Sequence, residues 1–169
     1  MSILSKEEIL IAIKKGQITI IPFNKENIGP ASIDLTLSDE FRLFKKGKQI
    51  CDVRENIDYK DLTKLIKTNS IILKPRETII RLTKEKITLS DNICGTLEGR
   101  SRFSRLGLMV QISAPFMHPG ISNNQALELT NLGPLSLRLY AGTKICQFIF
   151  EEVKGKAKYS GLFSKQSKI

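Results

Sequence analysis

The chain has 169 residues, the usual length of one domain, and residues 1–169 are expected to form a single unit. Its residues are 41% hydrophobic and 26% charged, which is enough for a buried core and excludes a wholly disordered chain. No apolar run reaches the roughly 18 residues of a membrane-spanning helix, so no membrane partner is expected. The N-terminus lacks the basic and apolar segments of a signal peptide, which predicts a cytoplasmic protein.

Lysine and arginine outnumber aspartate and glutamate by 27 to 17, giving a formal net charge of +10. This balance favours an anionic partner, which can be nucleic acid, an anionic membrane or a polyphosphate compound. The lysines are dispersed, apart from clusters within residues 45–48 and 154–168, and no aromatic residues alternate with them as on a single-strand stacking surface. A polyphosphate is therefore the expected partner and nucleic acid is not, and a solvated basic surface is the alternative for the clusters.

Three cysteines and one histidine restrict the metal chemistry of the chain. Cys51, Cys94 and Cys146 form no C-x-x-C pair, and His118 is the single histidine. Buried reduced thiols are therefore expected rather than a disulfide framework. The composition also excludes the ligand set of zinc-dependent nucleobase deaminases, so no zinc is expected.

The first predicted element is a short helix. Ser5 and Glu8 form a capping box, in which the serine hydroxyl accepts from the glutamate amide. The helix is expected to run to Lys15, because Gly16 then supplies a left-handed stop. Further on, the sequence predicts strands over residues 18–21 and 33–37, and a hairpin with strand residues 41–44 and a turn at Lys46-Gly47.

The rest of the chain reads as many short strands. Residues 59–68 are compatible with a helical turn or a loop, and the one polar helical candidate beyond them covers residues 101–106. Short apolar runs separated by turn residues predict a mainly β sandwich or barrel. These strands are expected over residues 71–73, 78–82, 93–96, 108–112, 125–130, 135–139 and 145–151.

A basic segment lies in the helical candidate. Arg100, Arg102 and Arg105 alternate there with Ser101 and Ser104. If the segment forms a helical turn, its free amides add to the guanidinium groups and create an anion site suited to phosphate. An exposed basic turn with no ligand is the alternative.

A glutamate in the middle of a predicted strand is the second candidate. Alternation places Leu127 and Leu129 on one face and Ala126 and Glu128 on the other. A carboxylate is disfavoured in mid-strand, so either that face is wet or Glu128 has a chemical task. His118 is expected to be structural on its own, and the polar segment 159–166 is either a lid, an inter-subunit arm or a frayed end.

Ordered motifs then run along nearly the whole chain: Ile3-Leu4-Ser5-Lys6-Glu7-Glu8-Ile9, Gly29-Pro30-Ala31-Ser32-Ile33-Asp34-Leu35-Thr36-Leu37, Gly99-Arg100-Ser101, Arg105-Leu106-Gly107-Leu108, Pro119-Gly120, Leu127-Glu128-Leu129, Asn131, Gly142, Ile145-Cys146-Gln147, Tyr159-Ser160-Gly161 and Gln166. In these motifs the chain resembles the dCTP deaminase family of the dUTPase-like superfamily. The resemblance implies a mainly β, dUTPase-like distorted β-barrel or jelly-roll-like fold with a short N-terminal helix and a short central helix. It also implies a homotrimer with active sites between subunits.

The resemblance further implies an enzyme, a hydrolase that converts dCTP to dUTP and ammonia in pyrimidine deoxynucleotide metabolism. Glu128 matches the general base that activates water for attack at cytosine C4, with no metal at the base. Ser101 and Arg105 match residues that line the reaction site, and Arg100 matches a phosphate-binding residue. Mg²⁺ is expected to arrive on the triphosphate, bound by phosphate oxygens and water.

Other substrate contacts also follow from the resemblance. The backbone of Ala126 and Leu127 falls where the family reads the pyrimidine edge, and Tyr159 and Gln166 match tail residues that close over the nucleotide. His118 stands where the family has an aspartate that contacts the deoxyribose 3′-hydroxyl and, in dUTPases, orients the attacking water. Leu162 stands in place of a tail lysine, whose charge Arg102 is a candidate to replace.

Two further functions remain open. One is a dUTPase, or a bifunctional enzyme that converts dCTP to dUMP with release of pyrophosphate, because both activities share this fold. The other is a homologue that binds nucleotide without turnover, which the residues at positions 118 and 162 motivate.

Overall fold

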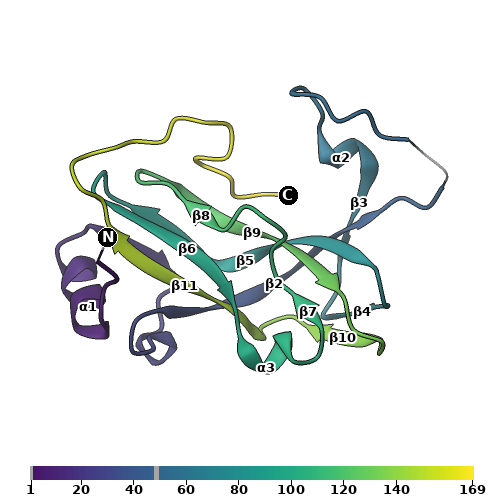
Figure 1. Cartoon of the computed structure of the whole chain (residues 1–169), viewed down its shortest axis with the longest axis horizontal. Coiled ribbons are helices and arrows are strands. Elements are labelled where there is room, and N and C mark those ends of the chain that lie inside the picture. The colour runs from purple at the N-terminus through teal and green to yellow at the C-terminus, as the bar shows by residue number, and fades with distance from the viewer. Residues whose placement is uncertain (1, 48–49) are drawn as a thin grey trace.

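Nine strands form one curled antiparallel sheet in the computed structural model, which describes residues 2–47 and 50–169 (Figure 1). The strand order is β7-β9-β5-β2-β11-β6-β8, with β1 also paired to β5 and β3 to β2, while β4 and β10 form a separate two-stranded sheet. The strands are β1 (Ile18–Ile21), β2 (Ile33–Phe44), β3 (Thr63–Lys67), β4 (Ser70–Leu73), β5 (Thr78–Leu89), β6 (Ile93–Gly99), β7 (Leu108–Met109), β8 (Phe116–Met117), β9 (Ser122–Asn131), β10 (Leu137–Tyr140) and β11 (Lys144–Glu152).

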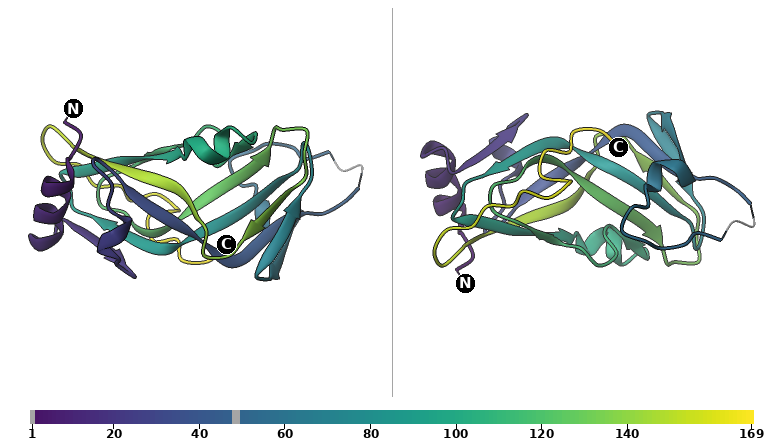
Figure 2. Two further views of the ribbon diagram at one scale, coloured as in Figure 1. Left: turned by 90° about the horizontal axis from the view of Figure 1, so that it is seen from below. Right: turned by 90° about the horizontal axis from the view of Figure 1, so that it is seen from above.

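The helices are short and lie at the ends of the sheet (Figures 1 and 2). Helix α1 (Lys6–Lys14) begins as predicted at Ser5, whose Oγ accepts from the Glu8 amide at 3.4 Å, and Gly16 follows it with φ +72°. The others are a 3-10 turn η1 (Lys25–Asn27), α2 (Tyr59–Leu62) and α3 (Ser101–Ser104). No helix in the described part of the chain combines the length and apolar character needed to cross a bilayer.

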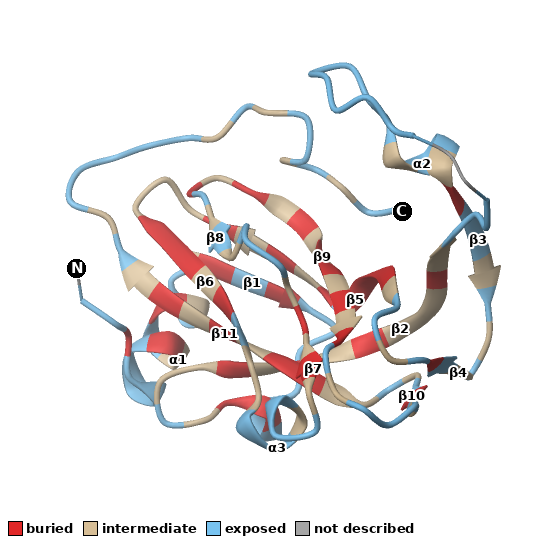
Figure 3. Cartoon of the chain, turned by 45° about the vertical axis from the view of Figure 1, so that its right-hand side comes forward, coloured by how far each residue is buried: buried red, intermediate tan, exposed pale blue. Residues whose placement is uncertain are grey.

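The mainly β fold with a short N-terminal helix and a short central helix, as predicted from the sequence, is confirmed. Alternating residues of the long strands point into one core, which includes Leu35, Leu127 and Phe148, all without exposed surface. Figure 3 shows this alternation as buried and partly buried bands along β6, β9 and β11. The opposite face of each strand is thereby left available for a site.

The predicted hairpin with a turn at Lys46-Gly47 is wrong. Strand β2 runs on to Phe44 and pairs with β3, so the connection spans residues 45–62 and contains α2. Phe41 is fully buried and lies opposite Ile66 of β3 and Arg81 of β5, so residues 33–44 form one continuous strand between two partners and not one arm of a tight hairpin. Lys48, the last lysine of the cluster at 45–48, lies outside the described residues.

Several predicted boundaries also shift. The strand expected over residues 108–112 contains only Leu108–Met109, and β3 and β8 were not expected as separate strands. The helical candidate 101–106 forms α3 over four residues, followed by turn. Each of these elements is too short for a periodic pattern to establish itself.

A buried glutamate marks the place where the sheet bends. The β2–β5 register shifts between Leu37 and Phe41, and the β5–β9 register shifts between Leu82 and Lys86. Glu85, 3% exposed, accepts from both the amide and the hydroxyl of Thr36 at 2.8 Å. Such a bulge increases the local bend, and it curls β5 and β9 around the core.

Arg81 on β5 is fully buried. Its guanidinium carbon lies 3.5 Å from the centroid of the Phe41 ring, and within the described residues none of its three nitrogens has a hydrogen-bond partner. Burial lowers the pKa of Arg81 to about 9, with Asp39 acting in the opposite direction. The ring contact offsets only part of the cost of removing the charge from water.

Replacing Arg81 with methionine is expected to raise the free energy of unfolding by about 1–2 kcal/mol, because a buried charge without a partner is removed while an apolar stem remains. Urea denaturation at pH 7 measures the change. Arg138→Met on the exposed face of β10 is the control and should shift stability by less than about 0.5 kcal/mol. A less stable Arg81→Met variant would show that the guanidinium is stabilising and contradict this account.

Candidate active site

A cavity of about 480 Å³ lies beside β9 and under the C-terminal tail, defined here as residues 153–169. Five of the residues predicted for the site line it together: Ala126, Glu128, His118, Tyr159 and Gln166. They come from β9, from the turn that precedes it and from the tail. The fold thus brings together residues separated by up to 48 positions (166 − 118) in the sequence.

Strand β9 positions the acid of this cavity. Its residues alternate strictly between partly buried and buried, so Ala126 and Glu128 share the face opposite Leu127. Leu127 is fully buried in the core, and a contact of its backbone with a base stays a prediction. The mid-strand glutamate therefore faces a cavity rather than open water.

Burial raises the pKa of Glu128 above its ordinary value. Hydrogen bonds from backbone amides act against this, and the Ile112 amide lies 3.5 Å from Glu128 Oε2. A carboxylate that is poorly solvated and weakly hydrogen-bonded is a stronger base than one in water. The arrangement suits a group that takes a proton near neutral pH.

The outer edge of β9 is open beside this carboxylate. The amides of Ser122 and Asn124 donate outward to tail carbonyls, at 2.8 and 2.9 Å. At the other end, Thr130 and Asn131 pair with β7. Because backbone groups alternate along an antiparallel strand, the N–H and C=O of Ala126 point to the same outer side, between these two pairings. This edge can pair with a planar ligand that carries adjacent donors and acceptors.

Sequence reasoning missed several residues of the cavity wall, among them Tyr59, Phe116, Asn123, Gln125 and Phe163. Asn123 donates to the Phe163 carbonyl at 2.7 Å, and Gln125 donates to the Asn123 side chain at 2.9 Å. The signal for Asn123 and Gln125 was the run of three amide residues at 123–125, which places polar groups on the core face of a strand. Tyr59 lies in the long connection and gave no such signal.

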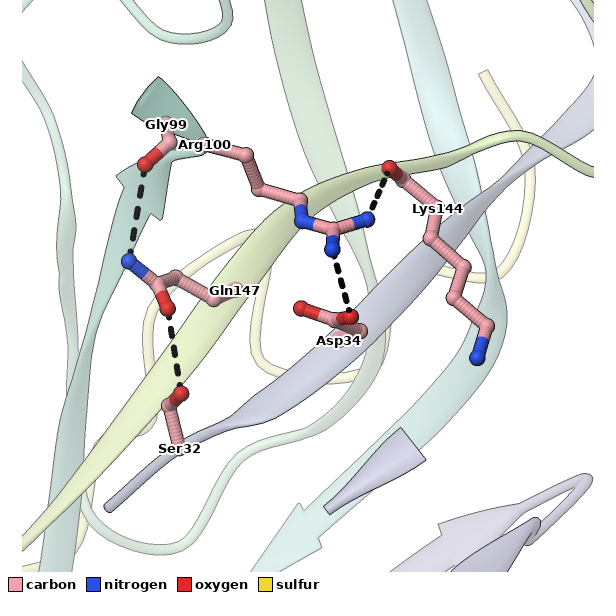
Figure 4. A network of polar contacts seen from close by, with 6 residues as sticks. All are labelled: Ser32, Asp34, Gly99, Arg100, Lys144 and Gln147. Carbon is pink, nitrogen blue, oxygen red and sulfur yellow. Dashed lines mark hydrogen bonds and ion pairs between the residues drawn. The ribbon is translucent and has the colours of Figure 1, made fainter. Parts of the chain in front are cut away.

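The basic segment at α3 lies outside this cavity. Arg100 turns inward, where its Nη2 lies 3.1 Å from Asp34 Oδ2 and its Nη1 donates to the Lys144 carbonyl at 2.8 Å. Figure 4 shows these contacts beside Gln147, which bridges Ser32 and the Gly99 carbonyl. Arg100 thus ties α3 to β2 and β11.

The other members of the segment are exposed. Ser101, Arg102 and Arg105 project from the short helix toward solvent, with no ion pair among the described residues. Within one copy of the chain, the predicted site is therefore divided. One half holds Glu128 in the cavity, and the other half is a free basic surface at α3.

The described residues include no group of three or more histidine, cysteine, aspartate or glutamate side chains arranged to hold a metal ion. Cys94 and Cys146 are buried, and burial raises the pKa of both thiols. Cys51 is exposed. Both buried thiols lie outside the lining of the cavity.

The chain is similar to known proteins along most of its length. A family model described as dCTP deaminase-like matches residues 3–153. A Nocardioides protein named "dCTP deaminase, dUMP-forming" is 35% identical over 174 residues, covering 97% of this chain and 91% of its own length. A protein of the same name from Methanosphaera stadtmanae is 35% identical over 156 residues, covering 89% of this chain and 79% of its own.

Solved structures show the same fold. The 2′-deoxycytidine 5′-triphosphate deaminase of Agrobacterium tumefaciens aligns with a TM-score of 0.69 at 15% identity, over 88% of this chain but only 47% of that protein. The dUTPase of phage phi11 of S. aureus aligns with a TM-score of 0.52 at 11% identity, over 86% of this chain and 96% of its own.

Arg100→Ala is expected to lower the free energy of unfolding by about 1–3 kcal/mol, because Asp34 and the Lys144 carbonyl lose their partner. Arg102→Ala is the matched control from the same segment, and its exposed side chain predicts a change below about 0.5 kcal/mol. Urea denaturation of both variants measures the difference. Equal stability of the two variants would contradict a structural role for Arg100.

Proposed function

Because the chain belongs to the dCTP deaminase-like family, we propose that it catalyses the hydrolytic removal of the 4-amino group of dCTP. The observation that carries the proposal is the position of Glu128, a half-buried carboxylate of raised pKa beside an open strand edge. Four other residues predicted for the site line the same cavity. A base-sized ring bound at that edge lies next to the acid that its chemistry requires.

In the proposed reaction, Glu128 takes a proton from a water molecule while the water oxygen forms a bond to cytosine C4. The protonated Glu128 then gives its proton to the 4-amino nitrogen, the C4–N4 bond breaks with release of ammonia, and the proton left on O4 moves to N3 to give uracil. One water is consumed, and the glutamate ends in its starting state. A positioned base that is poorly solvated supports both transfers near neutral pH.

The outer edge of β9 is proposed to read the base. Cytosine presents a donor at N4 next to an acceptor at N3, and Ala126 offers both a carbonyl and an amide on one side of the strand. Strand-edge recognition of this kind needs no charged side chain. It leaves Glu128, two residues further along the same face, free for the chemistry.

The exposed half of the site is proposed to act on a neighbouring copy. Ser101, Arg102 and Arg105 lie outside their own chain's cavity, which is what a trimer with sites between subunits requires. The guanidinium groups of Arg102 and Arg105 suit the triphosphate. Mg²⁺ is proposed to be carried by the triphosphate oxygens and water, and to neutralise part of the phosphate charge.

The reaction can end at dUTP or continue to dUMP. Relatives at 35% identity are named as dUMP-forming, which favours a second step in which dUTP is hydrolysed to dUMP and pyrophosphate. We therefore propose a bifunctional enzyme as the second candidate. The two steps would use the same cavity, because the uracil product differs from cytosine only in the group at C4 and at N3.

Separate assays for ammonia and pyrophosphate, with dCTP and with dUTP as substrates, test the proposal. Ammonia from dCTP without pyrophosphate indicates a deaminase that stops at dUTP, and both products from dCTP indicate the dUMP-forming reaction. Pyrophosphate from dUTP alone indicates a dUTPase. Nucleotide binding without either product would overturn both enzymatic proposals in favour of a binding protein.

Glu128→Gln is expected to lower kcat for deamination by at least about 10²-fold, because glutamine keeps the shape but cannot accept the proton. Nucleotide affinity should change little. In the unmodified protein, kcat should fall on acidification at a higher pH than for an ordinary glutamate, since burial raises the pKa of Glu128 and the basic form exists only above it. A near wild-type rate in Glu128→Gln would remove Glu128 from the mechanism.

Mixing two inactive variants tests the division of the site between copies. Glu128→Gln and Ser101→Ala each lack one half, and random exchange of subunits should restore about a quarter of the activity, because half of the copies supply each intact side. Each variant treated alone is the control. If mixing restores nothing while mixed oligomers form, both halves act within one chain.

A further inference from the structure

Three aromatic rings form one wall of the Glu128 cavity. The His118 ring stacks on Tyr159, with centroids 4.9 Å apart and planes 12° apart. Phe116 meets the same imidazole edge-on, at 4.8 Å and 85°. His118 and Phe116 belong to the segment before β9, whereas Tyr159 belongs to the C-terminal tail. The stack therefore joins the tail to the sheet.

The tail wraps around the Tyr159 ring from the other side. A side-chain carbon at Gly161 would lie 2.2 Å from the Tyr159 Oη and 2.3 Å from its Cζ, so only glycine leaves room there. The Tyr159 amide donates to the Pro119 carbonyl at 2.9 Å, next to His118. The ring is thus in contact both with the imidazole and with the tail backbone at Gly161.

Beyond this point the tail covers the cavity. Its carbonyls at Ser164 and Gln166 accept from the Ser122 and Asn124 amides of β9. The Gln166 side chain donates to the Tyr59 hydroxyl at 3.2 Å, and Ile169 is buried against Ile80 and Leu82 on β5. Figure 2 shows the tail running back over the sheet from the end of β11. Its anchors lie at both sides of the cavity.

We propose that His118 is a positioning residue that acts through Tyr159: its ring anchors the start of the tail, so that the tail is already closed over the cavity when nucleotide binds. Stacking, and not a hydrogen bond from the imidazole, is what the position supplies. The consequence for the nucleotide rests on the proposed function. The consequence for the tail does not, because it concerns only the contact between the His118 and Tyr159 rings.

The physical effect follows from a closing equilibrium. An aromatic pair of this geometry shifts such an equilibrium by roughly 2- to 10-fold. When the closed tail is the binding-competent form, losing the anchor raises the apparent dissociation constant by the factor by which the closed fraction falls. The bound nucleotide still draws the tail shut, so KM should rise while kcat stays nearly constant.

The test compares His118→Ala with His118→Phe in the full-length protein. Hydrogen exchange of the Tyr159, Ser122 and Asn124 amides reports tail docking without any substrate, and dCTP kinetics report its effect on turnover. In His118→Ala we expect faster exchange at all three amides and a KM raised by up to about 10-fold, the full change in the equilibrium being reached where the open tail becomes the major form. In His118→Phe, which keeps a stacking ring but no ring nitrogen, both values should return toward wild type.

Two further variants complete the design. Tyr159→Leu removes the stack by changing the tail and not the segment before β9. It should reproduce the exchange result even if His118→Ala fails to fold. Leu162→Ala is the matched tail control, because its side chain is 87% exposed, and it should leave exchange at the three amides unchanged.

Each contrary outcome is distinct. Unchanged exchange in both His118→Ala and Tyr159→Leu would show that the stack does not hold the tail, and would overturn the inference whatever the catalytic activity. A His118→Phe variant with wild-type exchange but a KM as high as that of His118→Ala would show that a ring nitrogen contacts the nucleotide instead. If no variant and no wild-type protein deaminates dCTP, the proposed function fails while the exchange result still decides the anchor.

Discussion

The antiparallel pairing of β5 with β9 is the constraint on which the rest of the site depends. It fixes the alternation of β9, so that Leu127 and Leu129 lie in the core and Glu128 faces the cavity. A shift of one residue would exchange these faces and bury the carboxylate among leucines, at a cost no cavity could offset. The register of the same pair of strands shifts between Leu82 and Lys86, beside the buried Glu85.

The positive charge of the chain has separate tasks that composition does not distinguish. Arg100 forms an ion pair with Asp34 and donates to the Lys144 carbonyl, and these contacts hold the α3 segment in place. Its neighbours Arg102 and Arg105 remain exposed, and they are the ones free for an anion. Arginine suits both roles because its planar fork can bind two acceptors at fixed angles. The basic motif therefore contains one arginine that holds the fold together and two that form an exposed basic surface.

The predictable features are those set by nearest neighbours along the chain. The Ser5 cap, the Gly16 stop and the alternation around Glu128 all follow from local chemistry, and the structure contains each of them. The position of Tyr59 could not be predicted, because its contacts come from other parts of the chain, among them Gln166, which donates to its hydroxyl. The same holds for the inward turn of Arg100, whose partners lie 66 and 44 residues away (100 − 34 and 144 − 100).

Closure of the tail and the strength of the base are physically linked. Burial is the main cause of the raised pKa of Glu128, and Phe163 and Gln166 of the tail form part of the cavity wall that excludes water from it. When the tail lifts, water reaches the carboxylate, its charged form is better solvated, and its basicity falls. A closed tail therefore keeps Glu128 a stronger base than an open one. The proposed role of the His118 stack on Tyr159 is to set how often the tail is closed before nucleotide binds, and thereby how well water solvates Glu128 in the free chain.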